Sequence, residues 1–331
     1  MLTTNLTRRR MIAIAATAAG SALLSSRGTR ADDAVRWRGS ALGAQVSLEI
    51  YHPDRALAEY LVRECLAEVR RLEQQFNLYQ QQSAICMLNR TGLLVDPGKD
   101  MVSLLRTSLY FSDLTGGAFD PTVQPLWTVH ADHFSSERPD PGGPSVELIS
   151  SALDKVGHKG LLVSDDRVAL VRRGAAITLN GIAQGYATDR VVDLLRNAGV
   201  STTLVDIGEL RAIGARPDGR PWRVGLADPE GPGKMTEILE LIDRSVATTA
   251  GAGFRFDPLG RFTHLFNPAT GRSPALYRTV SVIAPTATEA DALSTAFSLI
   301  PASRIREIVA ERRGIQARLV TAGGDLLVYG I

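Results

Sequence analysis

The stretch TLNGIAQGYATD at residues 178–189 constrains the fold of this 331-residue chain more than any other. Ile177 and Leu179 are typical of the end of a strand, and Asn180-Gly181 is a turn dipeptide. The apolar residues that follow recur every three or four positions, as they do in a helix. The sequence therefore predicts a strand, a tight glycine turn and a helix at this point.

A glycine turn that leads into a helix is a place where a ligand can bind. Backbone N–H groups at the first turn of the helix have no partner within it, and the helix dipole favours an anion there. The alternative is an ordinary strand–turn–helix corner that binds nothing. This stretch alone leaves both interpretations open.

The N-terminus carries the pattern of an export signal. Arg8-Arg9-Arg10 precedes a short alanine-rich run, which is followed by the small-residue exit Thr29-Arg30-Ala31. This is typical of a bacterial Tat-type signal, so we expect residues 1–31 to be the signal peptide, residues 32–331 the mature protein, and the location to be the periplasm. The run is too short and too weakly apolar for stable membrane insertion.

The charge balance argues against a nucleic-acid partner. The chain has a formal net charge of +2, but residues 1–31 contain five arginines and no acid, which leaves 37 − 5 = 32 basic against 35 acidic side chains, a net charge of −3. A basic surface of the kind that binds nucleic acid is therefore not expected. The two cysteines, Cys65 and Cys86, are too few for a cysteine metal cluster, and Cys65 lies on the apolar side of a predicted helix, which favours a buried free thiol.

Two polar groups late in the chain have a functional and a structural interpretation. His264 precedes the rigid turn Asn267-Pro268 and is either a structural or a catalytic histidine. Asp291 and Thr295 are spaced i, i+4 on a predicted helix, and a carboxylate and a hydroxyl one turn apart suit Mg²⁺. Asp291 also lies three residues after Thr288, where an acid caps a helix start.

The periodicity of the remaining chain predicts alternating helices and strands. Expected helices cover residues 54–76, 101–114, 182–199 and 288–299, and expected strands cover 37–51, 202–207, 222–226, 238–242, 245–248 and 280–284. A hairpin is expected at 161–171 and a surface insertion at 131–146.

Seven segments, in this order, resemble the ApbE family of FAD:protein FMN transferases. They are Leu42-Gly43-Ala44, Tyr79 with Leu88-Asn89, and residues 117–123, 178–187, 245–250, 264–271 and 290–295. The resemblance runs from about residue 39 to about residue 301. It implies an α+β fold, a single ApbE-like domain in which mixed or antiparallel sheets are flanked by helices around a FAD cleft.

The resemblance also implies a reaction and a site. FMN is moved from FAD through a phosphoester bond onto a threonine of a partner flavoprotein, and AMP is released. Mg²⁺ is expected to be held by Asp291, Thr295 and the backbone carbonyl of Gly181, with His264 and Asp291 as the catalytic residues. The positions implied to line the FAD site are Leu42, Tyr79, Ala118, Phe119, Asp120, Thr178, Gln184 and His264.

The chain departs from the family pattern at several of these positions. Thr178 replaces an aspartate and Gln184 replaces a lysine, so one acid and one base are lost together. The sequence LNGIAQGYATD resembles the NosX branch of the family. Members of that branch support nitrous oxide reduction, a step of denitrification, by flavinylating a NosR-like membrane flavoprotein. The Thr178 and Gln184 substitutions leave open a non-catalytic FAD-binding carrier or assembly factor. A FAD pyrophosphatase, with water as the acceptor in place of threonine, is a further alternative.

Overall fold

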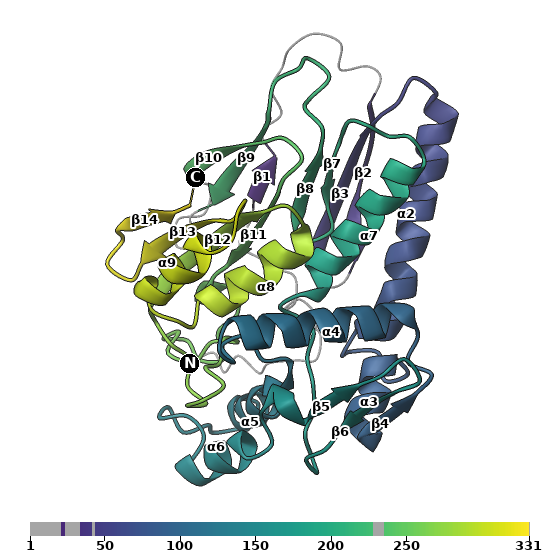
Figure 1. The fold of residues 1–331 in the computed structure, drawn as a ribbon. Coiled ribbons are helices and arrows are strands. Elements are labelled where there is room, and N and C mark those ends of the chain that lie inside the picture. The colour runs from purple at the N-terminus through teal and green to yellow at the C-terminus, as the bar shows by residue number, and fades with distance from the viewer. Residues whose placement is uncertain (1–20, 24–33, 42–43, 228–234, 331) are drawn as a thin grey trace.

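The computed structural model describes residues 21–23, 34–41, 44–227 and 235–330. The signal expected at residues 1–31 lies outside the described residues except for β1 (Ser21–Leu23). Leu42 and Gly43 also lie outside them. Figure 1 shows a large sheet covered by helices, with a smaller layer of helices and short strands below it.

An eight-stranded sheet in the order β14-β13-β12-β11-β8-β7-β3-β2 forms the centre of the molecule. Every pair of neighbouring strands within it is antiparallel. The sequence led us to expect mixed or antiparallel sheets, and this sheet is of the antiparallel kind. The strands are β2 (Ala34–Ala41), β3 (Ala44–Tyr51), β7 (Thr203–Asp206), β8 (Leu210–Ile213), β11 (Ser245–Thr249), β12 (Tyr277–Ala284), β13 (Gln316–Thr321) and β14 (Leu326–Tyr329).

Both faces of this sheet are buried, and β12 shows how one strand serves both. Val280 and Val282 belong to the main core, whereas Ile283 belongs to a second core on the opposite face. Successive side chains of a strand point to opposite faces, which explains why β12 is buried continuously from Thr279 to Ala284. The main core contains residues of α2 (Arg55–Phe76), α7 (Ala183–Asn197), α8 (Ala287–Phe297) and α9 (Ala302–Ala310), and the second contains residues of β9 (Trp222–Ala227) and β10 (Met235–Leu241).

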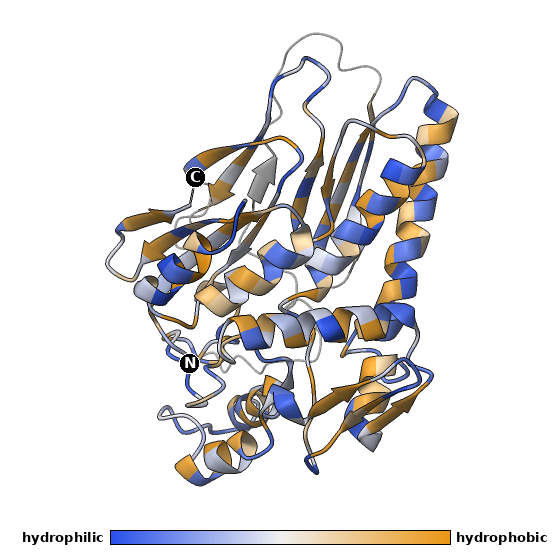
Figure 2. Cartoon of the chain, viewed as in Figure 1, coloured by the Kyte–Doolittle hydropathy of each residue, from blue (hydrophilic) through white to orange (hydrophobic). Residues whose placement is uncertain are grey.

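The long helix predicted at residues 54–76 is α2. The Asp54 carboxylate accepts a hydrogen bond from the Leu57 N–H (3.0 Å), which caps the helix as the sequence order suggests. Its apolar stripe, which includes Leu61, Cys65 and Leu72, is buried. Figure 2 shows the same division on the other helices, where hydrophobic and hydrophilic residues alternate with the helical turn.

The smaller layer consists mainly of short elements. They are α3 (Ala84–Thr91), α4 (Lys99–Leu114), α5 (Gln124–Phe134), α6 (Val146–Leu153) and a three-stranded sheet of β4 (Leu93–Val95), β6 (Arg167–Leu170) and β5 (Leu161–Val163). In Figure 1, α4 crosses between this layer and the main sheet. An aromatic cluster that includes Phe134, Phe256 and Phe266 ties α5 to the loop that carries His264.

The prediction of a strand before the central turn is wrong. Residues 176–179 form no strand, and their backbone groups pair elsewhere. The Asn89 side chain of α3 receives the Ile177 N–H (2.7 Å) and donates to the Ile177 carbonyl (2.8 Å), while the Thr178 N–H donates to the Pro121 carbonyl (2.7 Å). A side-chain amide thus replaces the neighbouring strand that the apolar pattern suggests.

Three other local predictions differ from the structure. The strand expected over residues 37–51 is a hairpin of β2 and β3. The helix α3 was not predicted; Ser83 caps it by accepting from the Cys86 N–H, a signal that the polar loop before it obscured. The insertion expected at 131–146 begins with the last turn of α5, and only the residues after Phe134 form a loop.

The cysteines agree with the expectation of a buried free thiol at Cys65. Cys65 is buried and both cysteines are free, so the structure contains no disulfide between them. Burial raises the pKa of the Cys65 thiol to about 12. Among the helices of the described residues, none combines the length and apolar character needed to cross a bilayer.

Candidate active site

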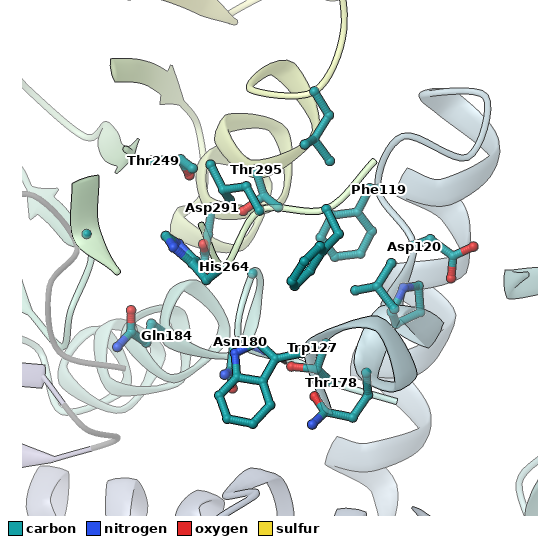
Figure 3. A pocket seen from close by; sticks show the side chains of 18 of the residues that line it. Phe119, Asp120, Trp127, Thr178, Asn180, Gln184, Thr249, His264, Asp291 and Thr295 are labelled. Carbon is teal, nitrogen blue, oxygen red and sulfur yellow. Dashed lines mark hydrogen bonds between the residues drawn. The ribbon is translucent and has the colours of Figure 1, made fainter. Parts of the chain in front are cut away.

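A cleft opens between the main sheet and the smaller layer, and the conspicuous sequence segments meet in it. The central turn contributes Thr178 and Gly181, the loop after β11 leads to His264, and α8 contributes Asp291 and Thr295. These segments are far apart in the sequence. Figure 3 shows Asp291, Thr295 and His264 around the same space, with Thr178, Asn180 and Gln184 near them.

The central turn and α8 are packed very closely. The Gly185 N–H donates to Asp291 Oδ2 (2.9 Å), and a Cβ added at Gly185 would lie 2.3 Å from the Ala287 carbonyl oxygen. Four residues earlier, in the turn before α7, a Cβ added at Gly181 would lie 2.9 Å from Thr295 Oγ1. Glycine at both positions therefore allows the turn and the start of α7 to approach α8 closely.

Asp291 does not cap its own helix. The cap of α8 is Thr286, whose hydroxyl accepts from the Glu289 N–H (3.2 Å), so the capping interpretation of Asp291 is wrong. The Asp291 side chain lies in the cleft instead and is 4% exposed. Burial raises its pKa, which the Gly185 N–H opposes and the charge of Asp189 reinforces. A carboxylate in such surroundings is stabilised when a cation binds to it.

Glu209, in the turn between β7 and β8, is a second buried acid in the cleft. It is 6% exposed, and burial together with the charges of Asp291 and Asp206 raises its pKa. In the sequence, Gly208 and Glu209 directly follow the strand expected at residues 202–207. Glu209 was not among the predicted site residues, because its proximity to Asp291 depends on how α8 lies against the sheet.

His264 has one ring nitrogen committed to the backbone. Its Nδ1 lies 3.3 Å from the Phe254 carbonyl oxygen, which can only accept, so Nδ1 carries the proton in the neutral ring. Burial lowers the pKa of His264, although the Phe254 carbonyl acts in the opposite direction. The neutral ring with a lone pair on Nε2 is therefore the favoured form at neutral pH, and Nε2 is available to accept a proton.

The Asp120 carboxylate is occupied by local contacts. It accepts hydrogen bonds from the N–H (2.8 Å) and hydroxyl (2.5 Å) of Thr122 and from the His158 N–H (2.9 Å). Figure 3 shows the carboxylate at the edge of the cleft, directed away from its centre. Asp120 thus caps the turn that begins at Pro121, and its contribution to the cleft comes from the rest of the residue.

The other predicted positions within the described residues also line the cleft. They are Tyr79, Ala118, Phe119, Thr178 and Gln184. Leu42 lies outside the described residues. The cleft has further lining residues that the sequence did not single out, among them Trp127, Asn180, Thr248, Thr249 and Leu299. Most of these are apolar or neutral, and residues of those types are too common in cores and loops to be recognised without the fold.

Comparisons with known proteins agree on one family. The model described as "ApbE family" matches residues 42–319. The FAD:protein FMN transferase of Escherichia coli (strain K12) is 30% identical over 264 residues, which cover 76% of this chain and 74% of that protein. The enzyme of the same name from Treponema pallidum (strain Nichols) is 29% identical over 281 residues, covering 75% and 76%.

Solved structures give the same result for the fold. The ApbE protein of Thermotoga maritima superimposes with a TM-score of 0.80 at 29% identity and covers 89% of this chain and 97% of that chain. The apo form of the flavinyl transferase ApbE of Pseudomonas stutzeri gives a TM-score of 0.76 at 28% identity, covering 91% and 97%. The expected α+β fold is thereby confirmed. With these matches and the converging motifs of the cleft, the chain belongs to the ApbE family of FAD:protein FMN transferases.

Proposed function

We propose that the protein uses Mg²⁺ and the cleft described above to move FMN from FAD onto a threonine hydroxyl of a partner protein. The observation that carries the proposal is the convergence of Gly181, Asp291, Thr295 and His264 on one cleft from separate parts of the chain. In the transfer, a bond forms between the threonine Oγ and the phosphorus of the FMN half, and the bond from that phosphorus to the AMP oxygen breaks. The flavin phosphate becomes a phosphoester, and AMP leaves.

In this proposal the proton of the attacking threonine goes to His264. Its Nε2 bears the lone pair because Nδ1 faces the Phe254 carbonyl, and burial lowers the pKa of the ring. A base in this form accepts a proton from a hydroxyl that comes within hydrogen-bond reach during attack. The exposed Tyr79, which lines the cleft, offers an aromatic face for a planar ring such as flavin.

The residues of the cleft suit a magnesium ion. Among the described residues, no three His, Cys, Asp or Glu side chains are grouped as ligands, so a ligand set made only of such side chains is not expected. Mg²⁺ instead takes few protein ligands and keeps several waters. The buried Asp291 carboxylate, the Thr295 hydroxyl and the Gly181 carbonyl would hold it. Bound there, the ion would neutralise charge on the pyrophosphate.

The two substitutions in the central stretch keep the charge of the cleft low. Thr178 and Gln184 are neutral where the family pattern has an acid and a base, and both line the cleft. Glu209 beside Asp291 is a second buried acid, and burial together with the charges of Asp291 and Asp206 raises its pKa. We therefore infer that a cation bound in the cleft favours the ionised form of both acids.

We further propose that the protein works in the periplasm after Tat export and that its acceptor is a NosR-like flavoprotein of nitrous oxide reduction. The twin arginine at Arg8-Arg9 supports export by the Tat pathway. The sequence LNGIAQGYATD, which resembles the NosX branch, supports a NosR-like acceptor. Fractionation of cells that express the full chain tests the first part, because a protein found in the cytoplasm with residues 1–31 intact contradicts it.

AMP release separates the transferase from the two alternatives. The protein is incubated with FAD and Mg²⁺, with and without a NosR-like acceptor domain, and AMP is quantified by chromatography. The proposal predicts AMP only with the acceptor, in equal amount to covalent flavin. AMP and free FMN without the acceptor indicate a pyrophosphatase, whereas bound FAD with no AMP under either condition indicates a carrier.

A further inference from the structure

We propose that Asp189, the last residue of the stretch 178–189 and not one of the predicted site residues, is a positioning residue that holds α8, and with it Asp291 and Thr295, in register against the central turn. This inference rests on the proposed function, because it concerns the residues that would hold Mg²⁺. Asp189 does not line the cleft itself. It would act through the helix that it contacts.

Asp189 lies in α7, yet it caps the start of α8. Its Oδ1 accepts from the Ala287 N–H (2.9 Å), and its Oδ2 accepts from the N–H (2.9 Å) and the hydroxyl (2.5 Å) of Thr288. The first N–H groups of a helix have no partner within the helix. Within α8, the Thr286 hydroxyl accepts a hydrogen bond only from the Glu289 N–H. Asp189 accepts from the two preceding N–H groups, those of Ala287 and Thr288.

Arg211 keeps this carboxylate fixed. It extends from β8 and forms an ion pair with Asp189, and the two side chains are only 8% and 13% exposed. A buried carboxylate is stable when it is both paired and hydrogen-bonded, as Asp189 is. The pair therefore joins three elements, the strand β8 and the helices α7 and α8, at one point.

Helix α8 runs past α7 and the turn before it in a ladder of three contacts. Asp189 contacts Thr288, Gly185 contacts Asp291, and Gly181 lies against Thr295. The residues are four apart along the central stretch, and they are three and four apart on α8, so each contact is one helical turn from the next. The last two contacts contain the three residues of the proposed magnesium site.

The ladder explains how a distant carboxylate affects that site. Gly185 and Gly181 have no side chains with which to hold α8 in place, and the one hydrogen bond that they contribute is that of the Gly185 N–H to Asp291. Asp189 is the residue of the ladder whose side chain accepts three hydrogen bonds from α8. Without it, α8 can slide or rotate relative to the turn, and small displacements of ligands weaken metal binding.

The test compares metal binding with stability in matched variants. Asp189→Asn keeps the shape of the side chain but loses its charge and one acceptor, and Thr288→Val removes only one of the three donors. The control is Asp193→Asn, one turn further along α7, where the side chain is 51% exposed and lies 3.8 Å from Arg190. Mn²⁺, which prefers the same oxygen ligands as Mg²⁺, is titrated into each protein with FAD and followed by electron paramagnetic resonance.

The inference predicts a graded loss of Mn²⁺ affinity with the proteins still folded. Asp189→Asn should weaken binding about tenfold, in the range found when outer partners of metal ligands are removed, and Thr288→Val about threefold. Asp193→Asn should stay within about twofold of the wild type. Thermal unfolding of each variant is recorded without metal, and the affinities are compared at a temperature at which all four proteins are folded.

Several outcomes overturn the inference. It is contradicted if Asp189→Asn binds Mn²⁺ with wild-type affinity, or if Asp193→Asn loses as much Mn²⁺ affinity as Asp189→Asn. If Asp189→Asn does not fold, Thr288→Val decides, and unchanged binding in that variant contradicts the inference. Asp291→Ala separates the two proposals: if it binds Mn²⁺ like the wild type, the magnesium site itself is wrong and the inference falls with it; if only Asp291→Ala loses Mn²⁺, the positioning role alone fails.

Discussion

Gly185 lies so close to α8 that its replacement should be costly. A Cβ at this position would lie 2.3 Å from the Ala287 carbonyl oxygen and 2.8 Å from Asp291 Cβ. Neither backbone nor a buried Cβ can move aside cheaply, so Gly185→Ala should lower the free energy of unfolding by about 3 kcal/mol. Chemical denaturation measures this.

The matched control for that substitution is Gly160→Ala. A Cβ at Gly160 would meet only Arg172 Cγ, at 3.8 Å, which is an ordinary contact. Its effect should remain within about 0.5 kcal/mol. A Gly185→Ala protein as stable as this control would show that the two helices are further apart than described.

The carboxyl group of Asp206 should make the stability of the protein depend on pH. Burial, opposed by a hydrogen bond from the Gly208 N–H, raises the pKa of its carboxyl from 3.8 to about 6. The protonated form is thus favoured in the folded state, so the stability that Asp206 contributes is complete below pH 3.8 and is lost as the pH rises through about 6. Asp206→Asn should therefore increase the free energy of unfolding by about 2 kcal/mol at pH 7.5 and change it little at pH 3.5.

Urea denaturation at the two pH values tests that prediction, with the exposed Asp193→Asn as the reference. The expected signature is a difference between the two variants that appears only at the higher pH. An Asp206→Asn protein that is equally or less stable than the wild type at pH 7.5 would contradict the raised pKa.

At the scale of elements, the tie between α3 and the central stretch depends on one side chain. Asn89 pairs with both backbone groups of Ile177. Asn89→Ala leaves a buried donor and acceptor unpaired and should cost about 3 kcal/mol of unfolding free energy. Hydrogen exchange should show faster loss of protection at Ile177 than in the wild type. Unchanged protection at Ile177 would mean that another group satisfies its N–H.

The helix α2 and residues 176–179 show where sequence patterns succeed and where they fail. The helix α2 was predictable because its stripe of apolar residues repeats over many turns and Asp54 marks its start. Residues 176–179 look like a strand because Ile177 and Leu179 are buried, but their partner is Asn89, 88 positions away. A local pattern reports burial and not the identity of the partner, so the strand was predicted where none exists.

The whole molecule brings together what the sequence could only place in order. The motifs identified Gly181, Asp291, Thr295 and His264, and the fold places all four around one cleft. The roles of Glu209 and Asp189 were not predictable, because each depends on α8 lying against the turn. Such contacts between distant segments depend on how the helices pack on the main sheet, an arrangement that can be followed in Figure 1.

The most direct test of the account is covalent transfer by the wild type and by Asp291→Asn, an isosteric variant that lacks the buried charge. Each protein is incubated with FAD, Mg²⁺ and a NosR-like acceptor domain, and the acceptor is examined by in-gel flavin fluorescence and by mass. The account predicts an FMN adduct on one acceptor threonine with the wild type, which EDTA abolishes, and a rate at least about a hundredfold lower with Asp291→Asn. Equal labelling by both proteins, or labelling that EDTA leaves unchanged, would contradict it.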